Sequence, residues 1–213
     1  MSGRLRIALT KGRLQDKSVE LFEGAGLDCA PVRSPGRRLI HALPNYPLDV
    51  VLAKAPDVIT YVEHGVCDLG VVGKDTILEK GGAFYEVLDL GFGRCRFALA
   101  VKKGSDFYGT YKTRRVASKY PNVTRAFFEG KGMDVDIIKI EGSVELAPIL
   151  DLADGIVDIV ETGATLKENG LEPIEDVAQV SARLIVNTAS MKLYKNEITD
   201  FLTRIERELE ART

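Results

Sequence analysis

The sequence lacks the features of several classes of protein. Its three cysteines, Cys29, Cys67 and Cys95, are odd in number and far apart, so they form neither a disulfide framework nor a metal knuckle. We therefore expect a reducing compartment, the cytoplasm. No run approaches the roughly 18 apolar residues of a membrane span, and charge follows the first short apolar run too soon for a signal peptide. Neither membrane association nor export is expected.

A surplus of charge of one sign is also absent. The chain has 29 basic and 31 acidic side chains, a net charge of −2. A non-specific nucleic-acid binder needs a basic surplus, so we expect no nucleic-acid partner. His41 and His64 do not have the spacing of metal ligands. The sequence contains no nucleophile elbow and no Cys–His pair.

The composition is that of a globular protein, with 45% hydrophobic and 28% charged residues. At roughly 150 residues per domain, 213 residues make one large domain or two small lobes. Strand-length apolar runs such as Leu5–Thr10 and Leu48–Ala53 alternate with helical patterns such as 14–25 and 197–212. This alternation predicts an α/β fold with largely parallel sheets.

No linker, low-complexity tract or repeat divides the chain. Gly91-Phe92-Gly93 is the best candidate for a hinge between lobes, and a plain loop is an equal alternative. Further strands are predicted at 39–43, 68–72, 86–90, 95–102, 134–140, 156–160 and 177–187. Further helices are predicted at 56–64, 74–80, 121–131, 143–150 and 165–169. The short segment 115–118 is ambiguous.

A turn after one apolar strand has the composition of a phosphate site. Glu161 and Thr162 follow the strand, Gly163 allows a tight turn and a close approach to an anion, and Ala164 and Thr165 open a helix. The free N–H groups of a helix start and two threonine hydroxyls suit a phosphate monoester. A capped helix with no ligand is an alternative of about equal weight.

Carboxylates accompany this turn. Asp154 and Asp158 share one face of the strand by alternation, and Glu161 takes the other. Carboxylates beside a phosphate site can hold sugar hydroxyls or a magnesium ion.

Three turns combine basic residues with glycine. Lys11-Gly12-Arg13 follows the first strand, at the sheet edge where open α/β sheets bind ligands, although it has no Walker A or dinucleotide spacing. Arg33 and Arg37-Arg38 flank Pro35-Gly36, and the guanidinium fork suits a pyrophosphate. Gly73-Lys74-Asp75 is a weaker turn of this kind. For the first two turns, a solvated surface without a ligand is the favoured interpretation when each is taken alone.

Taken together, these motifs resemble those of the ATP phosphoribosyltransferase family, whose members are the first enzyme of histidine biosynthesis. The likeness extends over nearly the whole chain, and the full set is highly specific. Its segments are 11–14, 57–65, 68–70, 73–75, 119–123, 142–148 and the phosphate turn.

The chain departs from the family pattern at three positions. The signature from Glu145 to Leu166 matches except that Asp151 stands where glycine is usual. Thr10 replaces the usual proline before Lys11, and Lys54 stands where many members have arginine.

The resemblance implies two α/β lobes like those of type II periplasmic binding proteins, with the active site in the interlobe cleft. Lobe I is expected at 1–91 plus 180–213 and lobe II at 92–179. Because the chain ends shortly after Leu209, it resembles the short form. Short-form members need a regulatory subunit related to histidyl-tRNA synthetase, in a hetero-octamer.

The resemblance also implies the reaction: transfer of the 5-phosphoribosyl group from phosphoribosyl diphosphate to N1 of ATP. Thr162, Gly163, Ala164 and Thr165 would bind the 5-phosphate, and Asp154, Asp158 and Glu161 the ribose. ATP or pyrophosphate would contact Lys11, Gly12, Arg13, Arg37 and Lys54, of which Lys11, Arg37 and Lys54 are the expected catalytic residues. Magnesium would be held mainly by substrate and water.

Two alternatives belong to other classes. A Rossmann-like nucleobase phosphoribosyltransferase would have two adjacent acidic residues before the loop, whereas Val160 precedes Glu161 here. A solute-binding protein of the same architecture would have an export signal and no phosphate turn.

Overall fold

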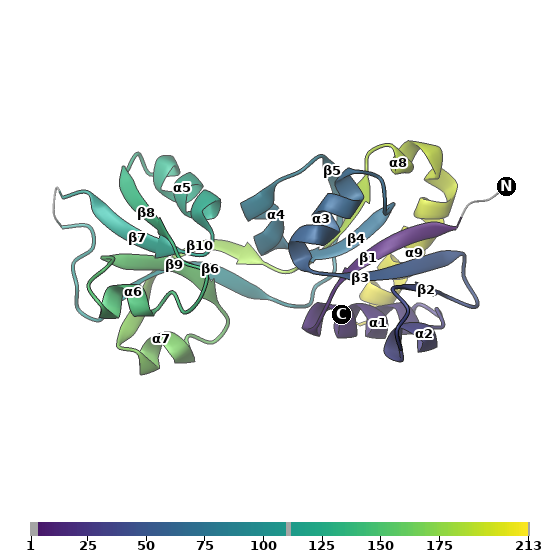
Figure 1. Ribbon diagram of the computed structural model, residues 1–213, viewed down its shortest axis with the longest axis horizontal. Coiled ribbons are helices and arrows are strands. Elements are labelled where there is room, and N and C mark those ends of the chain that lie inside the picture. Colours follow the sequence, from purple (N-terminus) through teal and green to yellow (C-terminus); the bar gives the residue numbers. More distant parts are fainter. Residues whose placement is uncertain (1–3, 110–111, 213) are drawn as a thin grey trace. The chain divides into compact units, whose positions relative to one another are not determined.

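The structure is a computed structural model that describes residues 4–109 and 112–212. The chain forms two compact units. The first unit comprises Met1–Gly93 with Ser181–Thr213, and the second comprises Arg94–Val180 (Figure 1; purple to blue with yellow, and teal to green). The chain therefore crosses between the units twice, within two residues of each crossing expected from the sequence.

The first unit is built on one mixed sheet with the strand order β2-β3-β1-β4-β11-β5. Its strands are β1 (Leu5–Thr10), β2 (Ile40–Ala42), β3 (Leu48–Ala53), β4 (Leu69–Gly73), β5 (Phe84–Asp89) and β11 (Ala182–Asn187). β3 and β4 both pair with β1 in parallel, whereas β2 and β11 add antiparallel neighbours. β11 lies between β4 and β5, so the last part of the chain completes this sheet.

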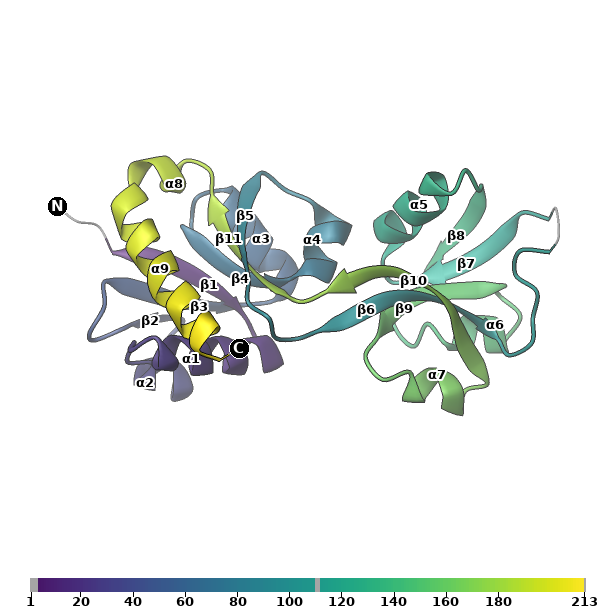
Figure 2. The same ribbon diagram turned by 180° about the vertical axis from the view of Figure 1, so that it is seen from behind.

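Helices bury both faces of this sheet. They are α1 (Arg13–Gly24), α2 (Ala30–Arg33), α3 (Ala55–Glu63), α4 (Lys74–Lys80), α8 (Ser190–Leu193) and α9 (Lys195–Ala211). α1 and α9 share a core on one face, where the rings of Phe22 and Phe201 meet edge to face with centroids 5.5 Å apart. α3 buries Val58, Ile59 and Val62 on the other face. Figure 2 shows α9 running across its face of the sheet.

The second unit has its own sheet, with the strand order β10-β6-β9-β7-β8. Its strands are β6 (Cys95–Lys102), β7 (Arg114–Ser118), β8 (Val135–Lys139), β9 (Gly155–Val160) and β10 (Leu171–Val180). β8 and β9 pair with β7 in parallel, whereas β6 is antiparallel to both β9 and β10. The carboxyl ends of β7, β8 and β9 therefore meet at one edge of the sheet.

Short helices cover the two faces of the second sheet. They are α5 (Pro121–Gly130), α6 (Leu146–Ile149) and α7 (Ala164–Glu168). α5 packs Val123 and Phe128 on one face. α6 and α7 bury Ala147 and Leu166 on the other. The second unit therefore has a hydrophobic core independent of the first.

The mixed sheets differ from the largely parallel sheets that the sequence predicted. In each unit three parallel strands form one part of the sheet, and antiparallel strands complete it. The antiparallel strands include those that lead the chain into and out of the second unit, β5 and β6, then β10 and β11. Helix length and apolarity give no membrane-spanning candidate among residues 4–109 and 112–212.

Candidate functional site

The predicted phosphate turn follows β9 in the second unit. Val160 ends the strand, Glu161 and Thr162 form the turn, and Gly163 precedes α7. Gly163 has φ +77° and ψ 4°, a left-handed conformation that costs a residue with a Cβ about 1–2 kcal/mol. The backbone of the turn therefore favours glycine at this position.

The turn lies at the surface of the second unit. Thr162, Ala164 and Thr165 are exposed. The amide of Ala164 is 3.4 Å from Thr162 Oγ1, and the Lys167 amide donates to the carbonyl of Gly163 at 3.1 Å. α7 is only five residues long, so its dipole is smaller than the sequence pattern suggested. The amides and hydroxyls of the turn itself are the main groups that could bind a phosphate.

Asp158 lies on β9, three residues before Glu161, and is half-buried. Its Oδ1 accepts a hydrogen bond of 2.8 Å from the amide of Ile159. Burial is the largest cause of a raised pKa for the Asp158 carboxyl; the charge of Glu145 raises this pKa further, whereas the Ile159 amide and the charge of Lys119 lower it. A half-buried carboxylate beside the turn is suited to accept hydrogen bonds from a sugar.

The structure does not bring Asp154 together with the turn. Asp154 precedes the first residue of β9, at the opposite end of the strand. Its Oδ2 accepts a 2.8 Å hydrogen bond from the amide of Arg115, and its Oδ1 is 4.0 Å from Arg114 Nη1. These contacts fix the start of β9 against β7, which is a structural role.

Two charged residues for which the sequence suggested no individual role, Lys119 and Glu145, act on Asp158. Lys119 follows β7, and Glu145 precedes α6. Both charges act on the pKa of Asp158. The predicted topology could have indicated Lys119, because a residue that follows a parallel strand lies at the same sheet edge as the phosphate turn.

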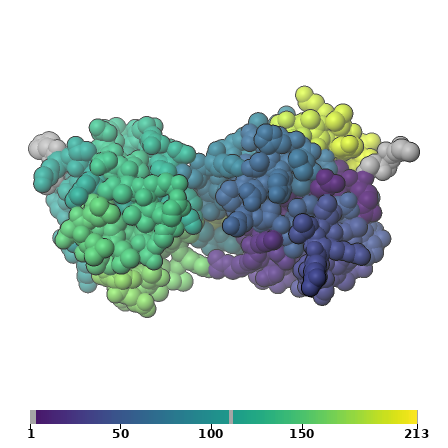
Figure 3. Space-filling model, in the orientation of Figure 1, coloured from purple at the N-terminus to yellow at the C-terminus, as the bar shows by residue number. Residues whose placement is uncertain are grey.

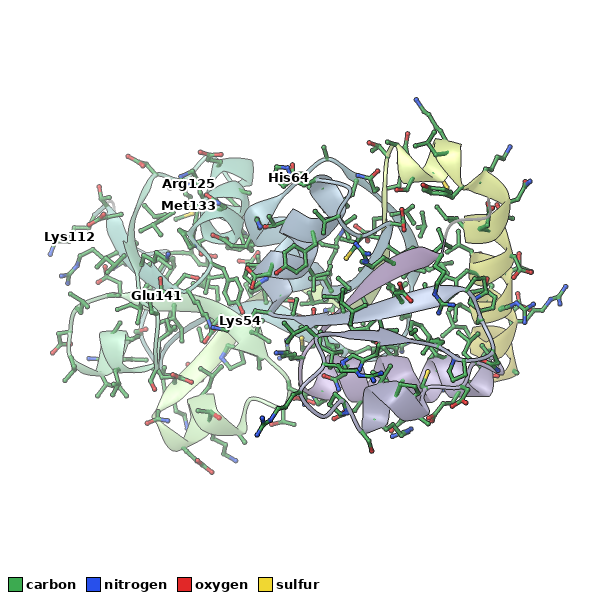
Figure 4. The ribbon with its side chains drawn as sticks, turned by 45° about the vertical axis from the view of Figure 1, so that its right-hand side comes forward. Lys54, His64, Lys112, Arg125, Met133 and Glu141 are labelled. Atoms are coloured by element: carbon green, nitrogen blue, oxygen red, sulfur yellow. The ribbon has the colours of Figure 1, made fainter. Side chains whose placement is uncertain are left out.

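The basic turns of the first unit lie at one edge of its sheet. β1 and β3 are in parallel register, with Thr10 opposite Ala53, so Lys11 and Lys54 follow neighbouring strand ends. Figure 4 labels Lys54. The Lys11 amide donates to the carbonyl of Ala53 at 2.9 Å, and Gly12 has φ +91°. Two lysines therefore share the carboxyl edge, where this fold class binds ligands.

The loop that carries Arg37 enters β2 from the same edge. β2 is antiparallel to β3, and its first residue, Ile40, lies opposite Val51 near the carboxyl end of β3. Arg37 and Arg38 are exposed, and the segment that contains them lies at the surface of the first unit in Figure 3. They line a pocket of about 390 Å³ together with the buried His41.

Two of the other predicted cations, Arg33 and Lys74, are engaged elsewhere. Arg33 forms hydrogen bonds of 2.7 and 2.5 Å to the carboxylate of Glu23, which removes it from the proposed pyrophosphate loop. Lys74 Nζ is 2.5 Å from Glu86 Oε2. Arg13 begins α1.

The described residues provide no metal cage of their own: among residues 4–109 and 112–212 no group of three or more His, Cys, Asp or Glu side chains could hold a metal ion.

Comparisons with known proteins identify the family. The family model described as HisG: ATP phosphoribosyltransferase matches residues 54–207. An ATP phosphoribosyltransferase of Clostridium kluyveri is 58% identical over 95% of this chain and 93% of its own length. One from Clostridium acetobutylicum is also 58% identical, over 97% of this chain and 96% of its own.

Solved structures show the same fold. The ATP phosphoribosyl transferase (HisG:HisZ) complex from Thermotoga maritima matches with a TM-score of 0.82 and 33% identity, over 97% of this chain and 99% of that one. The periplasmic aliphatic sulphonate binding protein SsuA from Escherichia coli matches with a TM-score of 0.62 over 98% of this chain and 73% of its own. At 12% identity, this second likeness shows the fold alone, and it confirms the expected type II periplasmic-binding-protein architecture. On the family model and the identity to its relatives, the chain belongs to the ATP phosphoribosyltransferase family.

Proposed function

We propose that the chain transfers the 5-phosphoribosyl group of phosphoribosyl diphosphate to N1 of ATP and releases pyrophosphate, the first step of histidine biosynthesis. Membership of the family supports this activity. The observation in the molecule that carries it is the left-handed Gly163 turn with its exposed threonine hydroxyls at the end of β9.

In this proposal the donor is held by the second unit. The turn residues 162–165 bind the 5-phosphate through N–H groups and hydroxyls, which cost no reorganisation because the backbone already fixes them. Asp158 accepts hydrogen bonds from the ribose hydroxyls, with Glu161 beside it. The position of Asp154 at the far end of β9 leaves it out of this set.

A second set of proposed contacts serves the nucleotide and the leaving group. Lys11, Gly12, Arg13, Arg37 and Lys54 are the proposed contacts to the ATP phosphates or the pyrophosphate. The bond between the anomeric carbon and the diphosphate oxygen breaks, and that oxygen keeps the electron pair. Adenine N1 then forms the new bond with a lone pair that it already carries, so no general base is needed. Positioning and charge neutralisation account for the rate.

Magnesium would bind together with the diphosphate of the donor. Mg²⁺ keeps several waters and binds phosphate oxygens readily. The chemistry that it would supply is neutralisation of the leaving group. The residues named above bind and orient the substrates.

The proposed assembly is a hetero-octamer with a regulatory subunit related to histidyl-tRNA synthetase, as in the short form. The match to the HisG chain of a HisG:HisZ complex, over 99% of that chain, supports a partner of this kind. The proposed compartment is the cytoplasm. All three cysteines are free thiols, two of them buried, which fits a reducing environment.

The test is an ultraviolet assay for the N1-ribosylated adenine product, with and without a candidate regulatory subunit. We expect product formation that depends on both substrates and increases with the subunit. Calorimetric titration with each substrate gives an independent measurement. A chain that binds neither substrate and forms no product in either condition would contradict the proposal, and would favour a solute receptor.

A further inference from the structure

Lys119 occupies a fixed position at the carboxyl edge of the second sheet. β7 and β9 are in parallel register, with Val116 opposite Gly155 and Ala117 opposite Ile156. Continued by two residues, this register brings Lys119 level with Asp158. Ser118 secures the position, because its Oγ donates to the carbonyl of Val157 at 2.6 Å and its own carbonyl accepts from the Ile140 amide at 3.0 Å.

Two carboxylates lie within electrostatic range of this lysine and have other hydrogen-bond or ion-pair partners. The positive charge of Lys119 acts to lower the pKa of the Asp158 and Glu141 carboxyls. Glu141, labelled in Figure 4, lies on the segment that follows β8. Glu141 is instead paired with Lys139 at 2.8 Å. Lys119 is exposed, and within residues 4–109 and 112–212 its ammonium has neither a hydrogen bond nor an ion pair.

Several other cations of this unit are held in ion pairs. Lys102 is paired with Asp151, Lys131 with Glu175, and Arg96 with Asp176. An unpaired ammonium at the edge where the phosphate turn lies is available for an anionic ligand.

The position of Lys119 relative to β9 determines which part of the donor it can contact. The turn begins three residues after Asp158, about 10 Å further along β9 at roughly 3.3 Å per residue. Lys119 is therefore level with the expected ribose site, not with the 5-phosphate. The other anionic group of the donor is the diphosphate on the anomeric carbon.

We propose that Lys119 binds the diphosphate of phosphoribosyl diphosphate and is a further binding residue for the donor. The inference rests on the proposed function, since it takes the donor to be bound by the 162–165 turn. An ammonium at this point would neutralise the leaving group in the ground state and as negative charge develops on it.

The experiment compares two ligands that share the 5-phosphate and the ribose: phosphoribosyl diphosphate and ribose 5-phosphate. Their affinity ratio, measured by isothermal titration calorimetry at fixed Mg²⁺, isolates the contribution of the diphosphate. We expect Lys119→Met to lower this ratio about tenfold, as for loss of one charge-assisted hydrogen bond. The affinity for ribose 5-phosphate should change less than about twofold, and Lys119→Arg should restore most of the ratio.

Lys103→Met is the matched control. Lys103 is also exposed, but it follows β6, which is antiparallel to β9, so it lies at the opposite edge of the same sheet. Its substitution should leave the ratio unchanged. An unchanged ratio in Lys119→Met, or an equal loss for both ligands, would overturn the role of Lys119 while leaving the proposed function intact. Failure of the unsubstituted chain to bind either ligand would instead remove the proposed function.

Discussion

Thr165 exposes its hydroxyl in the first turn of α7, and this permits a clean test of the phosphate turn. We expect Thr165→Val to weaken binding of phosphoribosyl diphosphate about tenfold or more, because a hydrogen bond to a charged group contributes about 1.5–3 kcal/mol. The two side chains have nearly the same shape, so the melting temperature should stay nearly constant. Calorimetry and a thermal melt measure the two quantities, with Thr199→Val on the exposed side of α9 as the control. Unchanged affinity would remove the turn from its role.

Asp158 should make stability depend on pH. Burial raises the pKa of its carboxyl in the folded state. Below the ordinary pKa of about 3.9 the group is protonated in both states, and the cost of burying a charge is absent. As pH rises through the raised pKa, the folded state loses stability relative to the unfolded state. Asp158→Asn avoids that loss and retains an oxygen for the Ile159 amide.

We therefore expect Asp158→Asn to have a higher free energy of unfolding than the parent at neutral pH, with the difference shrinking towards pH 4 and below. Urea unfolding at several pH values measures it. Donor binding should weaken in the same variant, since functional carboxylates are often held at the expense of stability. A variant that is less stable than the parent at pH 7 would contradict the prediction.

Asp151, which precedes β9, has a backbone conformation that favours glycine. Its φ is +58°, the one positive φ at a non-glycine residue among residues 4–109 and 112–212. This conformation explains why glycine is usual at this place in the family pattern. Asp tolerates it better than most residues, and Lys102 pairs with its exposed carboxylate at 2.5 Å.

We expect Asp151→Gly to be more stable than Asp151→Ala by about 1 kcal/mol, because both remove the ion pair and only alanine retains a Cβ. On the extended strand β8 the order should reverse, so Asp136→Ala should be more stable than Asp136→Gly. Chemical denaturation of the four variants gives the comparison. The same order at both positions would show that backbone conformation does not explain the difference.

Strands and helices with a regular apolar period were predicted well from the sequence. β1, β3, β6 and α4 have the expected bounds, since each strand is a largely apolar run and α4 ends at Gly81. β10 begins at Leu171, well before the predicted 177. Its ladder with β6 has register shifts between Pro173 and Glu175 and between Asp176 and Ala178, which break the alternation. The four-residue helices α2 and α8 are too short to show a period.

The site could be predicted in part for a related physical reason. Spacing correctly identified a strand followed by a glycine turn, because that signal is local. Spacing also grouped Asp154 with Asp158, since residues four apart share a face of a strand. It does not report that four residues span about 13 Å along that strand. Lys119 joins the site only through the pairing of β7 with β9, which is not local in the sequence.

The chain as a whole consists of one continuous unit inserted into a discontinuous one. The segment 94–180 contains a complete sheet and its own hydrophobic clusters. We expect this segment, expressed alone, to unfold cooperatively and to bind ribose 5-phosphate. The segment 1–93 should be poorly folded, because β5 would lose its neighbour β11 and the core of α1 would lose α9.

Urea unfolding followed by circular dichroism compares the two segments, with the full chain as reference. A disordered 94–180 segment, or a 1–93 segment that unfolds as cooperatively as the full chain, would contradict this prediction.

The location of β11 between β4 and β5 also governs the order of events on the ribosome. Those two strands are translated early, but the strand that joins them emerges only after the whole inserted segment. Nascent chains acquire structure domain by domain as they lengthen. We therefore expect the segment 94–180 to fold first during synthesis. The sheet of the first unit can be completed only after β11 has emerged.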